Sequence, residues 1–94
     1  MAIVVEIRVP QASREEADRF DAGIEAAMRE GGGPPAGLMV HLARPDGDGF
    51  LLVNVWRNEA DLRAFWDVIA SRLSEAGLPF DEPTISPVWS FARP

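Results

Sequence analysis

The chain lacks cysteine, lysine and tyrosine, and it has a single histidine, His41. Without cysteine, disulfides, thiolate metal sites and a cysteine nucleophile are all excluded. Without lysine there is no Schiff-base chemistry and no lysine anchor for pyridoxal phosphate. One histidine cannot build a multi-histidine metal site with other histidines of its own chain. We therefore expect a protein that uses neither a metal nor an organic cofactor.

Positive charge is also scarce, because the chain has 9 arginines and 15 acidic residues and its net charge is −6. The arginines form no basic block, which argues against binding to phosphate backbones and hence against nucleic acid as a partner. No run approaches the roughly 18 apolar residues of a spanning helix. Glu6 and Arg8 interrupt the first apolar run, which argues against a signal peptide. We expect a cytoplasmic protein with no membrane partner.

The most apolar stretch runs from Phe50 to Leu73 and predicts a strand that turns directly into a helix. Side chains alternate along a strand, so two apolar sets face opposite sides of the sheet. One set is Phe50, Leu52, Asn54 and Trp56, and the other is Leu51, Val53 and Val55. Asn58 is a suitable helix cap, and one apolar stripe follows it at a spacing of three or four residues: Leu62, Phe65, Ile69 and Leu73.

The remaining elements complete a βαββαβ order within one domain, residues 1–94. Residues 2–9 predict a strand, and Ser13 with Glu16 forms a capping box that starts a helix ending at Gly31. The glycine- and proline-rich residues 31–37 predict a surface connection. A strand over 38–43, a hairpin turn over 44–49 and a last strand over 84–92 follow. Pro87 indicates that this last strand lies at an edge.

This order predicts a ferredoxin-like α+β fold, a four-stranded antiparallel sheet with two helices on one face. We expect the set Phe50, Leu52, Asn54 and Trp56 on the open face, together with Glu6 and Arg8. Burying roughly 500 Å2 of that face would yield about 12 kcal/mol before association costs. The sequence therefore predicts a homodimer whose sheets meet face to face around a shared cavity, with association of two dimers left open.

The chain resembles a known family through the strand end Val55-Trp56, the following segment Arg57 to Leu62 and the aromatic pair Phe65-Trp66. It is similar to the antibiotic-biosynthesis-monooxygenase-like domains of the dimeric α/β-barrel superfamily. The resemblance implies dimers around a shared barrel, and some members oxygenate polycyclic aromatic phenols without metal or flavin. Others degrade haem with a helix histidine and a first-strand asparagine. Neither residue occurs at those places here, so haem is not expected.

Oxygenation without a cofactor needs a base, a hydrogen-bond donor and apolar walls. His41 is the candidate base, since its ordinary pKa is about 6.5, and Asn54 is the candidate donor to the developing anion. Trp56 is expected to stack on the substrate. The other candidate substrate contacts are Phe50, Leu52, Met39 and Arg8. Each also has a plain structural interpretation: a hydrogen-bonded histidine, a satisfied buried amide, or core and interface packing.

The resulting hypothesis is a cofactor-independent monooxygenase that acts on a small aromatic or polyketide-like phenol. The alternative is a non-catalytic dimeric ligand-binding or interaction module of the same fold. A cavity that joins His41 to Asn54 favours the first hypothesis, whereas a filled interior with His41 in solvent favours the second. The last strand is left open, because either Trp89 and Phe91 or Val88 and Ser90 face the cavity.

Overall fold

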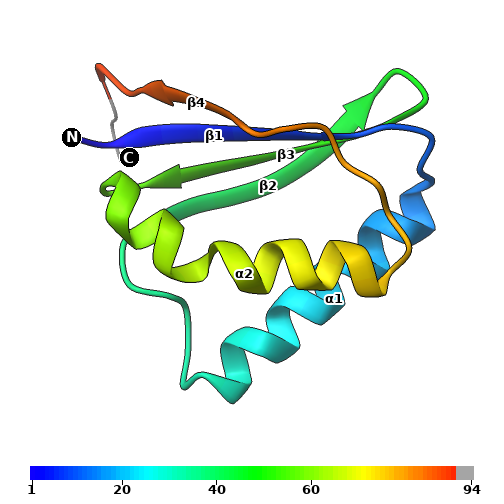
Figure 1. The fold of residues 1–94 in the computed structure, drawn as a ribbon, viewed down its shortest axis with the longest axis horizontal. Helices are drawn as coiled ribbons and strands as arrows, with labels where there is room; N and C mark the ends of the chain where they lie inside the picture. The colour runs from blue at the N-terminus through cyan, green and yellow to red at the C-terminus, as the bar shows by residue number, and fades with distance from the viewer. Residues whose placement is uncertain (91–94) are drawn as a thin grey trace.

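The computed structural model describes residues 1–90 and shows one antiparallel sheet with two helices (Figure 1). The elements are β1 (Ile3–Val9), α1 (Arg14–Glu30), β2 (Leu38–Asp46), β3 (Gly49–Trp56), α2 (Glu59–Glu75) and β4 (Thr84–Pro87). The strand order in the sheet is β2-β3-β1-β4. β1 and β3 are therefore neighbours in space, although α1 and β2 lie between them in the sequence. The predicted ferredoxin-like α+β fold is confirmed.

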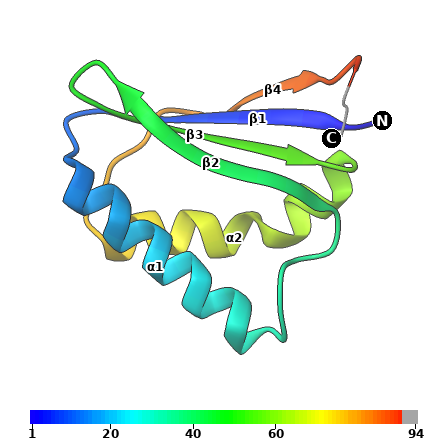
Figure 2. The same cartoon turned by 180° about the vertical axis from the view of Figure 1, so that it is seen from behind.

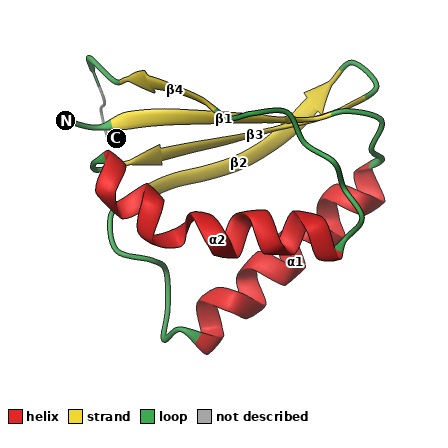
Figure 3. Ribbon diagram, in the orientation of Figure 1, coloured by secondary structure: helices red, strands yellow, loops and turns green. Residues whose placement is uncertain are grey.

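Both helices cover the same face of the sheet, as the two opposite views in Figures 1 and 2 show and as Figure 3 shows by element type. The core lies between these two layers. It joins alternate residues of β1 and β3 to the apolar stripes of the helices: Ile3, Val5, Ile7, Val9, Phe50, Leu52, Trp56, Ala17, Phe20, Ile24, Leu62, Ile69, Leu73 and Leu78. Within residues 1–90, the opposite face of the sheet has no helix over it.

The helix boundaries follow from capping groups that the sequence contains. The Ser13 side chain accepts a hydrogen bond from the Glu16 amide, and the Glu16 carboxylate accepts one from the Ser13 amide. Asn58 Oδ1 accepts from the Asp61 amide at the start of α2. These contacts satisfy amide groups that the first turn of a helix leaves unpaired. Both predicted caps, and the end of α1 at Gly31, are confirmed.

One prediction about the sheet is wrong, because Phe50, Leu52, Asn54 and Trp56 face the helices and not the open side. Val5 lies opposite Asn54 and Ile7 opposite Leu52 in the β1–β3 register, and these β1 residues are fully buried under the helices. The open face carries Leu51, Val53 and Val55 of β3. The candidate cavity therefore lies between the sheet and the helices of one chain.

The β2–β3 hairpin is longer than the sequence indicated. β2 continues to Asp46, which pairs with Gly49, so the turn itself occupies only residues 47–48. At its other end β2 contains a β-bulge between Leu38 and Val40. The extra residue shifts the alternation, so that both Leu38 and His41 lie on the helix side.

Within residues 1–90, β4 pairs only with β1 and forms an edge of the sheet, as Pro87 predicted. The strand is shorter than predicted and ends at Pro87, although the Val88 amide still donates to the Ala2 carbonyl at 2.9 Å. Trp89 is 93% exposed and does not line the cavity. Residues 91–94, which include Phe91 and Ala92 of the predicted strand, lie outside the described residues.

Candidate functional site

A small cavity lies between the sheet and the two helices, with a volume of about 30 Å3. Its walls are almost wholly apolar and come from α1, β2, β3 and α2: Phe20, Ile24, Met28, Leu38, His41, Leu52, Asn54, Trp56, Phe65 and Ile69. The space is about that of one water molecule. His41 and Asn54 thus line one cavity, which lies inside the monomer and not between two chains.

Three polar side chains from three elements form a hydrogen-bonded chain at the edge of this cavity. His41 Nδ1 lies 2.6 Å from Asn54 Oδ1, and His41 Nε2 lies 3.2 Å from Asp21 Oδ1. Asn54 is buried at 3% exposure, the His41 side chain is 28% exposed and the Asp21 side chain is 41% exposed. These three hydrogen-bonded side chains therefore connect the solvent at α1, through β2, to the buried amide on β3.

Trp56, which also lines the cavity, carries a buried polar hydrogen that has no acceptor among residues 1–90. Trp56 is only 1% exposed, and its indole Nε1 is buried without a hydrogen-bond partner within residues 1–90. The Trp56 ring lies 6.0 Å from the Phe65 ring, centroid to centroid, at 43°. Leaving a buried donor unpaired costs about 1–3 kcal/mol. An acceptor atom bound in the cavity would remove this cost.

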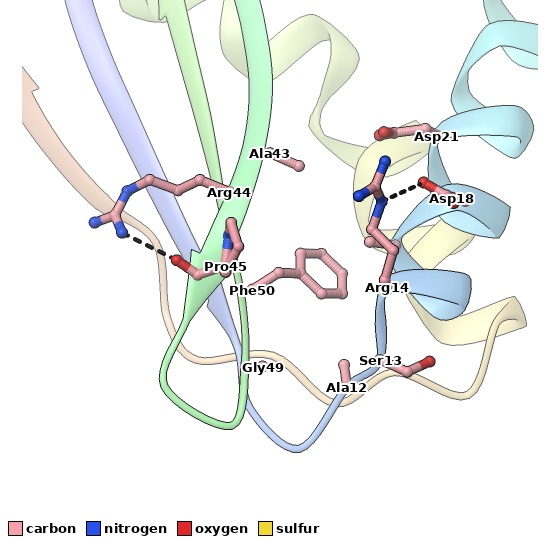
Figure 4. Close-up of a pocket in the computed structure, with 11 residues that line it drawn as sticks. Ala12, Ser13, Arg14, Asp18, Asp21, Ala43, Arg44, Pro45, Gly49 and Phe50 are labelled. Atoms are coloured by element: carbon pink, nitrogen blue, oxygen red, sulfur yellow. Dashed lines mark hydrogen bonds and ion pairs between the residues drawn. The ribbon is translucent and has the colours of Figure 1, made fainter.

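A larger groove of about 330 Å3 lies next to the chain of polar residues, between the start of α1 and the β2–β3 hairpin. Figure 4 shows the Phe50 ring pointing between these two elements and the Asp21 carboxylate directed towards Ala43. Asp21 lines this groove and also contacts His41, which lines the small cavity. The groove and the cavity are therefore separated by the Asp21–His41 contact.

The structure places the remaining candidate residues as follows. Leu52 lines the cavity, whereas Phe50 lines the groove. Met39 lies at the β-bulge, out of register with β3, and does not line the cavity. Arg8 lies on the open face, because its neighbours Ile7 and Val9 face the helices. The placements of Met39 and Arg8 do not support a role in this cavity.

Arg8 instead links segments at one end of the sheet. Its guanidinium contacts Asp46 at 3.2 Å, Asp48 at 3.0 Å and, more distantly, Asp81 at 3.9 Å. The first two residues belong to the hairpin region, and Asp81 precedes β4. Among the described residues, the ion-pair partners of Arg8 are these aspartates and not its neighbour Glu6. Its role here is structural.

Asp21 is the functional candidate that sequence reasoning missed. The apolar stripe of α1 passes through Ala17, Phe20, Ile24 and Met28, and residue 21 belongs to the same helical face by spacing. A carboxylate in that position interrupts the stripe facing the sheet. That interruption is the signal that would have drawn attention to Asp21.

The contacts of His41 raise its pKa above the ordinary 6.5, chiefly through the hydrogen bond to Asp21, with burial acting in the opposite direction. A raised folded-state pKa means that the native protein binds the proton more tightly than the unfolded chain. The stabilisation is therefore complete below pH 6.5 and is lost as pH rises through the folded-state pKa.

We expect urea denaturation to show this loss as a decrease in unfolding free energy with rising pH. Solvent screens the half-exposed Asp21, so the decrease should stay below about 1 kcal/mol. The Asp21→Asn variant should lack most of it. An equal pH dependence in that variant would contradict the assignment of the stabilisation to the Asp21–His41 contact.

Within residues 1–90, no group of three or more histidine, cysteine or acidic side chains is arranged to hold a metal ion. The same described residues contain no helix that is long and apolar enough to cross a membrane. The site as described consists of apolar walls, an amide, an indole and a histidine–aspartate pair.

Comparison with known proteins defines the fold. No protein-family model matches the chain, and no curated protein matches it in sequence. Solved structures do match over nearly the whole chain. One is a candidate antibiotic biosynthesis monooxygenase from Deinococcus radiodurans, with a TM-score of 0.61, 15% identity and coverage of 99% of this chain and 97% of that chain.

Two further matches have similar scores. A protein of unknown function from Nitrosomonas europaea has a TM-score of 0.64 at 18% identity, covering 99% of this chain and 94% of that one. SnoaB, a cofactor-independent oxygenase from Streptomyces nogalater, has a TM-score of 0.59 at 16% identity, covering 96% and 93%. At these identities the likeness concerns the fold. The chain has the ferredoxin-like fold of the antibiotic-biosynthesis-monooxygenase-like proteins, as the sequence resemblance implied.

Proposed function

We propose that this protein is a cofactor-independent monooxygenase that binds a small aromatic or polyketide-like phenol between its helices and its sheet. The observation that carries the proposal is an apolar cavity lined by both Asn54 and Trp56, together with a Trp56 indole N–H that is buried without a partner among residues 1–90. Two nitrogen donors within aromatic and aliphatic walls suit a flat ring that bears acceptor oxygens. The cofactor-independent oxygenase with this fold adds support.

Such a reaction needs no external reductant, because the substrate supplies the electrons. An activated ring CH2 group loses a proton, the resulting anion transfers electrons to O2, and the peroxide formed on that carbon loses water. The net change converts CH2 and O2 into C=O and H2O. The task of the protein is to stabilise the anion, for which preorganised donors such as Asn54 and Trp56 are suited. Both ring nitrogens of His41 contact other side chains, so water takes up the proton in this scheme and His41 acts by orienting the Asn54 amide.

The cavity must widen to admit a ring, since 30 Å3 holds only about one water molecule. Two half-buried wall residues, Met28 and Leu38, flank the connection over residues 31–37. The Gly33 amide donates to the Met28 carbonyl, which attaches this connection to the end of α1. Unbranched methionine readily changes rotamer to fill or clear space. This part of the wall is therefore the one that we expect to move on binding.

The test is oxygen uptake by metal-free protein with a panel of polycyclic phenols and their keto tautomers, such as anthrone, in aerobic and anaerobic buffer. We expect oxygen-dependent formation of the carbonyl product and one O2 consumed per molecule oxidised. Binding without oxygen uptake would instead support the alternative function, a non-catalytic ligand-binding module. If no compound of the panel binds or causes oxygen uptake, both the oxygenase and the ligand-binding module are overturned. The remaining function is then an interaction module.

We also propose that the protein is a homodimer formed through the open face of the sheet. That face carries the apolar side chains of Val4, Val40, Leu42, Val53 and Val55. Leu42 is 43% exposed, and within residues 1–90 no helix lies over this face of the sheet. Contiguous apolar surface of this kind is unusual on a soluble monomer. A second copy of the chain would bury it sheet against sheet, with the two cavities on the outer sides.

Val53→Arg is expected to convert the dimer to a monomer of 10.3 kDa in sedimentation velocity. Val53 lies opposite Glu6 in the register, so the new guanidinium has a partner within the monomer and the fold should be retained. Ala64→Arg adds the same charge on the exposed side of α2 and is the matched control. Identical sedimentation of Val53→Arg and the control would exclude the open face as the interface.

A further inference from the structure

The contacts of His41 imply a particular protonation state. Both ring nitrogens contact oxygen atoms that accept hydrogen bonds, Asn54 Oδ1 at 2.6 Å and Asp21 Oδ1 at 3.2 Å. A neutral imidazole has one N–H, whereas the imidazolium has two. Only the doubly protonated ring can donate to both oxygens at once. The Asp21 carboxylate supplies the negative charge that balances this cation.

This state fixes the orientation of the Asn54 carboxamide. Because Oδ1 accepts the hydrogen bond from His41, the amide Nδ2 is the end of the carboxamide that does not contact the ring. Asn54 and Trp56 are two residues apart on the same side of β3, so their donors belong to the same wall. Two side chains of this wall therefore carry N–H groups, and with its oxygen held by His41 the Asn54 amide offers only its N–H end.

Loss of one proton from His41 reverses this arrangement. If Nε2–H continues to donate to Asp21, Nδ1 becomes an acceptor. The Asn54 amide must then turn to donate Nδ2–H to the ring, which directs Oδ1 to the cavity. The charge on His41 thus determines whether Asn54 offers the cavity a donor or an acceptor.

We infer that Asp21 is a positioning residue for the cavity: by pairing with His41 it holds the Asn54 amide with its N–H directed inward, so that the site selects ligands with an acceptor oxygen. This inference deepens the proposed function, on which it depends for the identity of the ligand as a phenol or ketone. Asp21 itself need not touch the ligand. It acts from the solvent side through His41.

The other charged groups near His41 are engaged elsewhere. On α1, Asp18 pairs with Arg14 at 3.4 Å, and Glu25 lies 4.0 Å from Arg29. On β2, the Arg44 guanidinium donates to the Pro45 carbonyl. The α2 residues that line the cavity, Phe65 and Ile69, carry no charge, and neither do its β3 residues. Asp21 is thus the acidic group that contacts His41 within the described part of the chain.

Because His41 is the chain's single histidine, its ring protons give one unambiguous NMR titration. We expect the His41 midpoint to lie above that of a free histidine, to fall in Asp21→Asn, and to be unchanged in the matched control Asp18→Asn. The side-chain NH2 resonances of Asn54 should shift at the same midpoint as His41 in each protein. This measurement needs no ligand and no turnover.

A second experiment measures binding of 2-naphthol and of naphthalene, which lacks the oxygen. All measurements are made below the pH at which 2-naphthol ionises. Affinity of the native protein for 2-naphthol should fall roughly three- to tenfold as pH rises through the His41 midpoint, the change expected for one lost hydrogen bond. The fall should occur at lower pH in Asp21→Asn. Affinity for naphthalene should not change.

Asn54 NH2 resonances that do not follow the His41 titration would overturn the inference, whether or not any naphthol binds. Equal 2-naphthol affinity of Asp21→Asn and Asp18→Asn at every pH would also overturn it. If neither probe binds but the Asn54 and His41 titrations coincide and respond to Asp21→Asn, the positioning role holds. In that case it is the proposed phenol oxygenase that fails.

Discussion

Asn54→Leu is expected to lower oxygen-dependent turnover of a polycyclic phenol by at least about a hundredfold while the protein stays folded. Removing one preorganised donor to a developing anion typically costs a factor of about 10² to 10³. Leucine has the same branched arrangement of side-chain heavy atoms as asparagine and suits the apolar wall made by Leu52 and Ile69. The measurement is oxygen uptake with anthrone, accompanied by circular dichroism and thermal unfolding.

Leu52→Met is the matched control for this variant, because it alters the neighbouring cavity position on β3 without removing a polar group. It should keep turnover within a few-fold of the native rate, since volume-conserving apolar changes are usually tolerated. Unchanged turnover in Asn54→Leu would remove the amide from the mechanism. A loss of turnover that only accompanies unfolding would assign Asn54 a structural role.

Gly49→Ala is expected to destabilise the fold by about 3 kcal/mol, near the upper end for overpacking a well-packed site. Gly49 begins β3 beside the end of β1, and a Cβ there would overlap the Val9 carbonyl oxygen and approach the Pro10 Cα to 2.9 Å. Both neighbours are backbone atoms, which cannot rotate away as a flexible side chain can. Urea denaturation gives the change in unfolding free energy directly.

Gly31→Ala provides the comparison, because a Cβ at that helix end meets its nearest atom, the Ala27 carbonyl oxygen, at an ordinary 3.5 Å. Gly31 also has a negative φ of −84°, which alanine adopts without strain. We expect its effect to stay within about 1 kcal/mol. Similar stabilities for the two variants would show that β1 and β3 can separate at this point without cost.

Features of the fold that depend on local chemistry were predictable from the sequence. Ser13 with Glu16 and Asn58 with Asp61 mark the two helix starts, because each pair satisfies amide groups in the first turn. Pro87 marks an edge strand, because it cannot donate to a second neighbour. The order of elements then leaves few arrangements, and the ferredoxin-like sheet is one of them.

The side of the sheet that the helices cover was not predictable from β3 alone. Both sets of alternate residues in β3 are apolar, so its pattern does not distinguish a face under helices from a face that meets another chain. The information lies in β1, where Glu6 and Arg8 alternate with Ile7 and Val9. Because Ile7 pairs with Leu52, the apolar face of β1 identifies the face of β3 that lies under the helices. That step requires the register of the two strands, which the sequence does not give.

The site was predictable in part for a similar reason. His41 and Asn54 could be named because they are polar residues within apolar strands, and the register places them opposite each other. Met39 could not be excluded, since the β-bulge that displaces it leaves no clear trace in the sequence. Asp21 required knowing that α1 packs over β2, which brings its carboxylate to His41.

The most direct test of the account is the NMR signal of the Trp56 indole N–H during titration with 2-naphthol and, separately, naphthalene. The three tryptophans give three indole signals, which single Trp→Phe variants assign. We predict a large downfield shift of the Trp56 signal with 2-naphthol and a much smaller change with naphthalene, while the exposed Trp89 stays unchanged. A Trp56 signal that does not move with saturating 2-naphthol would contradict the assignment of this cavity as the phenol site.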